Sequence, residues 1–158
     1  MANLEILLPQ NLKQSNKPSA FGFIILSFIG FIDAAYLTVS YYLSSPPPCS
    51  LIEGCEKVLT SSYASVGAIP VALFGAVYYL TIFFLALFYT GNLNLHIMRF
   101  VSLLTLTGLL ATGVLMYLQL FVINAVCIFC LISAGTSIGL AALGARYLLS
   151  TDRSKKDL

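Results

Sequence analysis

The sequence predicts an all-α membrane protein built as a bundle of four transmembrane helices. Hydrophobic residues make up 59% of the 158 residues and charged residues only 9%, whereas a soluble domain carries about 25% charged residues. The apolar residues are gathered into four long runs with few or no charges inside them, 20–43, 69–89, 100–123 and 126–149. A helix needs about 20 apolar residues to cross a bilayer, and each run is long enough. Buried helices of a soluble protein would need polar faces to cover them, and the sequence lacks such faces.

The polar segments divide the chain into one membrane domain, 20–150, and two short tails, 1–19 and 151–158. The apolar stretch near the N-terminus is too short for the core of a signal peptide, so we expect 1–19 to be a tail. A single domain is all that this length allows. The net charge of +2 is small and scattered, which argues against a nucleic-acid partner and leaves membrane lipid as the surroundings of the domain.

Positive charges distinguish the two sides of the predicted bundle. The tails, the end of the fourth run and the connection before the third run carry them, at Lys13, Lys17, Arg99, Arg146, Arg153, Lys155 and Lys156. The loop at about 44–68 carries one lysine against two glutamates. The positive-inside rule therefore predicts a plasma (inner) membrane protein with both termini in the cytoplasm. Loop 44–68 and the turn at Asn124–Ala125 are then on the outer, periplasmic side.

All four cysteines fall on this outer side, where disulfides are tolerated. Cys127 and Cys130 form a C-x-x-C motif at the start of the fourth run, and residues three apart share one helix face, so their sulfurs can form a disulfide or a dithiol. The helix N-terminus favours a thiolate and burial opposes it, which leaves the sign of the pKa shift open. Cys49 and Cys55 lie in the loop, after three prolines that stiffen the approach to Cys49. Two such pairs suit a relay of thiol–disulfide exchange.

Two other uses of these cysteines compete with a relay. Inert structural disulfides are the ordinary use of paired cysteines outside the cell. A bridge between Cys127 and Cys130, however, would close a very short loop and constrain little of the unfolded chain. A zinc site made of all four cysteines would lack the second C-x-x-C that structural zinc favours, and we predict no metal.

A series of short motifs extends from the first apolar run to the last. They are GFIDAAYLT at 30–38, GCEKVLTSSYA at 54–64, Ile-Pro at 69–70, Phe-Gly at 74–75, Tyr-Leu at 117–118 and the C-x-x-C at 127–130. In this order they resemble the vitamin K epoxide reductase family, specifically bacterial and archaeal members. Many of those carry a fused thioredoxin-like domain, and we expect none here.

The resemblance implies a four-helix bundle around a quinone of the menaquinone, ubiquinone or phylloquinone type, with the outer cysteine-containing loop capping the quinone pocket. It implies that Cys130 lies beside the quinone ring with Cys127 as its partner. It also implies that Cys55 exchanges with Cys127, while Cys49 meets a separate thioredoxin-fold dithiol protein. Five further residues would fall near the quinone, namely Ser61, Tyr63, Val71, Phe74 and Tyr78. The implied function is a thiol–quinone oxidoreductase that supports disulfide formation outside the cytoplasm.

Three alternatives stay open at this point. Reduction of vitamin K epoxide is one, although the animal enzymes have Asn and Tyr where this chain has Val71 and Ala134. A non-catalytic four-span protein with structural disulfides is another. The third is a quinone-linked disulfide oxidase of the disulfide-bond B type, whose C-x-x-C lies in its first outer loop, the reverse of the order found here.

Three polar residues within the apolar runs have two interpretations each. Asp33 lies near the middle of the first run, where an unpaired ionised carboxylate is costly. We favour a packing role for Asp33 over a proton route. Tyr117 and Gln119, near the outer end of the third run, either line the pocket or anchor the helix at the membrane interface.

Overall fold

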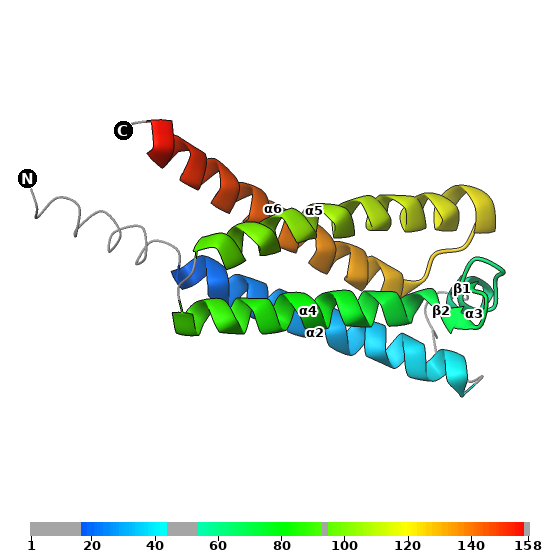
Figure 1. Cartoon of the computed structure of the whole chain (residues 1–158). Coiled ribbons are helices and arrows are strands. Elements are labelled where there is room, and N and C mark those ends of the chain that lie inside the picture. The colour runs from blue at the N-terminus through cyan, green and yellow to red at the C-terminus, as the bar shows by residue number, and fades with distance from the viewer. Residues whose placement is uncertain (1–16, 44–53, 93–94, 157–158) are drawn as a thin grey trace, which may run out of the picture.

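The protein is a bundle of four long helices, seen in a computed structural model that describes residues 17–43, 54–92 and 95–156. The helices are α2 (Lys17–Tyr42), α4 (Val71–Asn92), α5 (Leu95–Tyr117) and α6 (Ile128–Lys156) (Figure 1). Each contains a stretch long and apolar enough to cross a membrane. The predicted all-α bundle of four membrane helices is confirmed, and the helix ends lie within a few residues of the apolar runs, apart from the last turns of α6.

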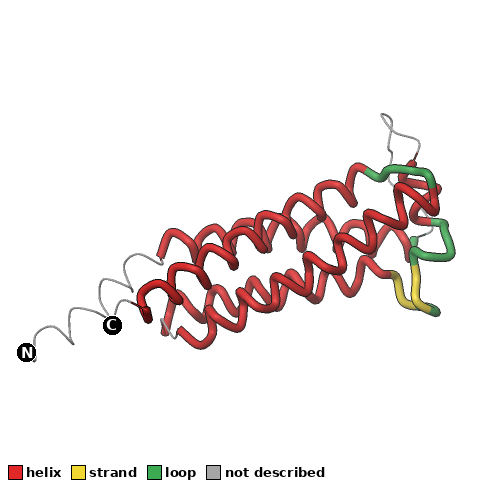
Figure 2. The backbone as a smooth tube through the Cα atoms, turned by 90° about the horizontal axis from the view of Figure 1, so that it is seen from above, coloured by secondary structure: helices red, strands yellow, loops and turns green. Residues whose placement is uncertain are grey.

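The short elements gather at one end of the bundle. These are helix α3 (Gly54–Leu59) and the hairpin of β1 (Ser65–Val66) and β2 (Ile69–Pro70), and α6 begins beside them (Figures 1 and 2). The start of α2, the end of α4 and the end of α6 lie at the opposite end. We call the end with α3 the cysteine end, because Cys55 and Cys127 both lie there.

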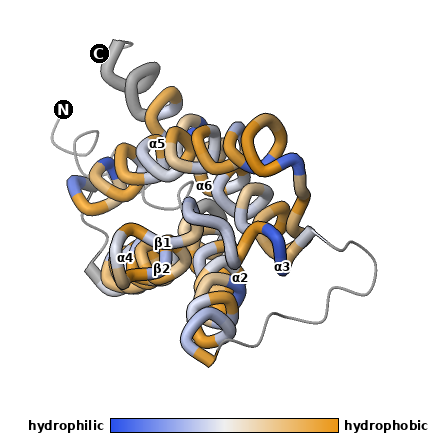
Figure 3. The backbone as a smooth tube through the Cα atoms, turned by 90° about the vertical axis from the view of Figure 1, so that its right-hand side faces the viewer, coloured by the Kyte–Doolittle hydropathy of each residue, from blue (hydrophilic) through white to orange (hydrophobic). Residues whose placement is uncertain are grey.

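The helices pack most closely in pairs. Helix α2 has its largest contact with α4, α6 packs on both α5 and α2, and the contact between α4 and α5 is the smallest among these neighbouring pairs. The fully buried side chains of the core include Phe23, Tyr79, Ile82, Met98 and Leu140. Many large apolar side chains of the long helices are also exposed on the outside of the bundle, and Figure 3 shows hydrophobic residues along each of these helices. Such a surface suits helices surrounded by lipid.

A buried polar cluster links α4 to α6. The Tyr79 hydroxyl donates a hydrogen bond of 2.8 Å to the carbonyl oxygen of Ser133. It also lies 3.0 Å from the Ser133 hydroxyl, 3.0 Å from that of Thr136 and 2.8 Å from that of Ser137. Since a buried hydroxyl without a partner costs free energy, this cluster fixes the relative position of the two helices.

Three features of the cysteine end are absent from the sequence-based expectation. Part of the expected loop forms the helix α3, and the hairpin turns through Gly67, whose φ is 66°. Helix α5 continues into the π-helix η1 (Leu118–Ile123), a geometry frequent at functional sites. The π-helix ends at Asn124 in a left-handed conformation (φ 50°, ψ 45°). The predicted turn at Asn124–Ala125 therefore reverses the chain into α6.

Candidate active site

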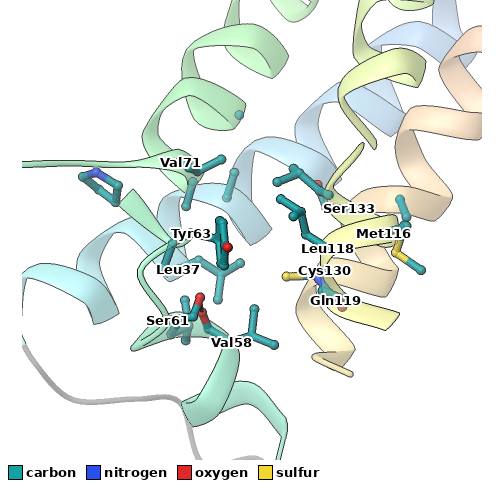
Figure 4. Close-up of a pocket in the computed structure, with 18 of the residues that line it drawn as sticks. Leu37, Val58, Ser61, Tyr63, Val71, Met116, Leu118, Gln119, Cys130 and Ser133 are labelled. Atoms are coloured by element: carbon teal, nitrogen blue, oxygen red, sulfur yellow. Dashed lines mark hydrogen bonds between the residues drawn. The ribbon is translucent and has the colours of Figure 1, made fainter. Parts of the chain in front are cut away.

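A cavity of about 140 Å³ lies inside the cysteine end of the bundle and is partly open to the surface (Figure 4). Its wall is mainly apolar, with a few polar groups, and every long helix contributes to it. The segment between α3 and α4 covers it from the end of the bundle. The lining residues are Asp33, Ala34, Leu37, Tyr41, Val58, Leu59, Ser61, Tyr63, Ala64, Pro70, Val71, Ala72, Gly75, Thr112, Leu115, Met116, Leu118, Gln119, Ile123, Cys130, Ser133 and Ala134.

The two cysteines of the C-x-x-C motif occupy different positions relative to this cavity. Both are free thiols. Cys130 lies in the first turn of α6 and lines the cavity, and Figure 4 shows its sulfur beside Gln119. Cys127 precedes the helix and has no exposed surface. Its carbonyl oxygen accepts the N–H of Leu131 at 3.1 Å, so Cys127 occupies the N-terminal cap position of α6.

The Cys127 thiol is poised to ionise. The Cys130 thiol donates a hydrogen bond to it, and the backbone N–H groups of Cys130 and Phe129 donate further ones. Burial opposes these donors, but together they lower the pKa of Cys127 to about 6. The structure therefore indicates a lowered pKa for Cys127, a direction that the sequence leaves open. Cys127 is mainly thiolate at neutral pH, and the thiolate is the form that attacks disulfides.

Cys55 lies against this thiol from another helix. Cys55, Val58 and Cys127 form one buried cluster, and neither cysteine has exposed surface. Cys55 is disulfide-bonded, in contrast to the two free thiols of the motif. A Cβ atom at Gly54 would overlap the backbone of Val126, so the glycine allows α3 to approach the start of α6. Cys49 lies outside the described residues.

Gln119 connects the π-helix to both thiols of the motif. Its side-chain oxygen accepts the backbone N–H of Cys127 at 3.4 Å, and its side chain hydrogen-bonds the Cys130 thiol. Gln119 is 3% exposed and lines the cavity. Of the two interpretations that the sequence left open, the structure therefore favours pocket lining for Gln119. Tyr117 differs, because it lies outside the cavity, half exposed and stacked on Phe121.

Asp33 also lines the cavity. Its side chain is 7% exposed, and its Oδ2 atom has no hydrogen-bond partner among the described residues. Asp33 lies within electrostatic range of both Cys127 and Cys130. The packing role that the sequence favoured does not account for a carboxyl group on the cavity wall, because packing residues satisfy their polar atoms.

The sequence of the chain matches the vitamin K epoxide reductase family over residues 22–145. The chain belongs to this family. The matched segment extends from α2 into α6 and so includes Asp33, Cys55, Gln119 and both cysteines of the motif. No curated protein matches the chain.

Proteins of the vitamin K epoxide reductase family are membrane oxidoreductases whose redox chemistry uses thiols and a quinone. This chain is accordingly an oxidoreductase and a multi-pass membrane protein. The cavity of about 140 Å³ is close in volume to an apolar cavity of about 150 Å³ that binds benzene, so its size and apolar wall suit one six-membered ring of a quinone. The residues available to hold the ring are the apolar wall and the polar groups of Gln119, Ser133 and Tyr63.

Of the five residues that the family resemblance placed near the quinone, some line the cavity and others do not. Ser61, Tyr63 and Val71 line the cavity. The Ser61 hydroxyl donates a hydrogen bond of 2.7 Å to the carbonyl of Val58, which holds the segment after α3 in a turn. The other two residues, Phe74 and Tyr78, are not part of the cavity wall.

Phe74 and Tyr78 lie on other faces of α4. Phe74 is 54% exposed on the outside of the bundle. Tyr78 packs edge-on against Tyr79, at 5.2 Å between ring centroids, and covers Gly108 of α5. Both residues therefore contribute to lipid contact or helix packing in this structure.

Proposed function

We propose that this protein is a membrane thiol–quinone oxidoreductase that supports disulfide bond formation outside the cytoplasm. A separate thioredoxin-fold dithiol protein on the outer side is the electron donor, and a menaquinone, ubiquinone or phylloquinone in the membrane is the acceptor. Electrons pass first through Cys49 and Cys55 and then through Cys127 and Cys130. The family membership supports the general chemistry, and the arrangement of the cysteines supports this order.

The observation that carries the proposal is the spatial order of three cysteines between helix α3 and the cavity. Cys55 and Cys127 lie in one buried cluster, and Cys130, one helical turn after Cys127, lines the cavity. Cys127 is therefore the thiol of the motif that faces the loop pair, and Cys130 is the one that faces an acceptor in the cavity. Inert structural disulfides would not require Cys127 to lie next to Cys55 while Cys130 lines the cavity. They would also not require free thiols at a cavity.

The first half of the cycle is thiol–disulfide exchange. The partner's dithiol reduces the bridge between Cys49 and Cys55 and is itself oxidised to a disulfide. The Cys55 thiolate then attacks Cys127 in the oxidised motif, which forms a Cys55–Cys127 bond and releases the Cys130 thiolate. Attack of Cys49 on Cys55 restores the loop bridge and leaves the motif as a dithiol. Each step exchanges one disulfide for another, so electrons and atoms balance.

The second half takes place at the cavity. A bound quinone supplies an acceptor for two electrons and two protons. Cys130 lies on the wall where that acceptor fits, and Gln119 holds the Cys130 thiol by a hydrogen bond. Val71 and Ala134 make their part of the wall apolar. The polar side chains that contact the vitamin K head group in the animal enzymes are thus replaced here, which favours quinone reduction over epoxide reduction.

The proposed orientation follows from charge. The start of α2 and the end of α6 lie at the end of the bundle opposite α3, and the basic residues of the sequence are concentrated there. Placing that end in the cytoplasm satisfies the positive-inside rule. The cysteine end then faces the compartment in which substrate proteins acquire disulfides.

The test is a single turnover without the partner. The purified full chain is reduced and freed of reductant under anaerobic conditions, then mixed with a soluble ubiquinone or menaquinone analogue. We expect quinol to form in an amount that matches the thiols lost, as counted by an alkylation gel shift. Cys130→Ser should abolish both signals, and Cys49→Ser should leave this half-reaction intact. Thiols that stay reduced in folded wild-type protein would refute the proposed function.

A further inference from the structure

We propose that Asp33 is the proton donor to the quinone in this reaction. The inference rests on the proposed function and extends it, since the thiols account for the electrons but not for both protons. Asp33 is a carboxylic acid on the wall of the cavity proposed for the acceptor, and one of its oxygens has no hydrogen-bond partner among the described residues.

The position of Asp33 is unusual for an acidic residue of a membrane helix. Its side chain is more than nine-tenths buried, and the Oδ2 atom has no hydrogen-bond partner among the described residues. A purely structural carboxyl group would use both oxygens, because a buried polar atom left unpaired loses the hydrogen bonds that it made with water. The unused oxygen is available to a ligand that enters the cavity.

The surroundings of Asp33 favour the neutral acid. Among the described residues, no lysine or arginine lines the cavity. The titratable groups that face it are the phenols of Tyr41 and Tyr63 and the thiol of Cys130, with the Cys127 thiolate within electrostatic range. A carboxylate in this mainly apolar wall would have no cationic side chain among the described lining residues to stabilise it. Asp33 therefore holds a proton when the motif is reduced.

The proton balance of the second half-reaction identifies the role of this acid. Cys127 enters as a thiolate and Cys130 as a thiol, so forming their disulfide releases two electrons and one proton. Reduction of a quinone to a quinol consumes two electrons and two protons. Asp33 supplies the second proton and becomes a carboxylate, which regains a proton from water after the quinol leaves. Charge is conserved, because one thiolate is consumed and one carboxylate is formed.

The first test compares Asp33→Asn with wild type in the anaerobic single turnover. Asparagine has nearly the same shape but no acidic proton. Since general acid catalysis contributes about 10²–10⁴-fold, we expect quinol formation to slow by at least about 100-fold. Oxidation of the same dithiol by a small aromatic disulfide in water, which needs no proton from Asp33, should keep its wild-type rate. Ser27→Ala is the matched control, because Ser27 is a buried polar residue of α2 that does not line the cavity.

The pH dependence of the wild type gives a second test that needs no variant. Both oxidations should become faster as pH rises through about 6, where Cys127 ionises. Quinol formation should then slow at higher pH as Asp33 loses its proton, whereas the reaction with the aromatic disulfide should stay fast. Asp33→Asn should remove the alkaline decline. Infrared spectra of the reduced protein should show the carbonyl band of a protonated carboxylic acid that is missing in Asp33→Asn.

The outcomes are distinguishable. A wild-type protein that forms no quinol refutes the proposed function itself. A wild-type protein that forms quinol without an alkaline decline refutes the role of Asp33 alone, and so does an Asp33→Asn variant that forms quinol at the wild-type rate. Loss of both the quinone reaction and the aromatic-disulfide reaction in Asp33→Asn, with intact unfolding behaviour, would also refute it, because the defect would then lie in the thiols.

Discussion

Cys55 of α3 and Cys127 at the start of α6 lie in one buried cluster, and neither has exposed surface. Cys55 and the C-x-x-C motif are thus already adjacent without any movement of the long helices. The contact makes the identity of the exchanging pair testable.

The double variant Cys49→Ser with Cys130→Ser should trap the bond between Cys55 and Cys127. It lacks Cys49, which would release Cys127 by attacking Cys55, and Cys130, which would release Cys55 by attacking Cys127, so mild oxidation should make the bond accumulate. Mass spectrometry of non-reduced peptides would detect the cross-linked pair. Adding Cys55→Ser should remove it, and recovery of Cys127 only as a free thiol in the double variant would contradict the proposed order.

The pKa of Cys127 should depend on the thiol of Cys130. Because the Cys130 thiol is the main donor to Cys127, Cys130→Ala should raise the pKa of Cys127 from about 6 toward its ordinary value. In the wild type, thiolate absorbance should therefore be present at pH 7 and disappear as pH falls through about 6. Ultraviolet titration of the reduced motif would measure both midpoints. An unchanged midpoint in the variant would assign the shift to the backbone donors of α6.

Gln119→Leu should slow oxidation of the motif by about 10-fold or more. The change removes the acceptor of the Cys127 N–H and the hydrogen bond to the Cys130 thiol. Each of these neutral hydrogen bonds contributes about 0.5–1.5 kcal/mol, so the two together contribute about 1–3 kcal/mol, and each 1.36 kcal/mol is a factor of ten in rate. The single-turnover rate and the pH midpoint of Cys127 would both be measured. Tyr117→Phe, on the exposed side of the same segment, is the control and should change neither.

Gly30→Ala should destabilise the bundle by about 1–3 kcal/mol, the usual cost of overpacking. A methyl group at Gly30 would lie 2.5 Å from Cε1 of Tyr79, and the polar cluster around its hydroxyl prevents Tyr79 from moving away. Gly135→Ala is the matched control, since no atom lies within 4 Å of the methyl group that it would add. Thermal unfolding in one detergent would compare the two variants. Equal melting temperatures would contradict this prediction, because they would show that the Tyr79 ring moves away from the added methyl group despite its hydrogen bonds.

The sequence predicted the long helices well because each one is a local pattern. Long apolar runs leave the backbone no alternative to hydrogen bonding within the segment once it is in lipid. The C-x-x-C motif and its place at a helix start are local in the same way. Cys127 and Cys130 could therefore be selected without knowledge of the tertiary structure.

The side chains around the cavity were harder to predict because α4 is apolar on all sides. A helix that faces both lipid and protein shows little amphipathic pattern, so the inward face cannot be identified from sequence. Val71 lines the cavity, whereas Phe74 and Tyr78 on the same helix do not. The depth of the cavity has no sequence signal either, so the sequence does not predict that Asp33, near the middle of the first run, lies on its wall. The π-helix that directs Gln119 toward the thiols has no clear sequence signal.

The hydrogen bonds of Tyr79 have a consequence for the shape of the cavity. The cavity wall draws on all four long helices, so its width depends on the spacing between them and not on the shape of any one helix. Helices α4 and α5 have the smallest contact among the neighbouring long helices, but the Tyr79 hydroxyl joins α4 to α6 through Ser133, Thr136 and Ser137. The site is therefore preorganised, because polar bonds inside the bundle set its width before any ligand enters.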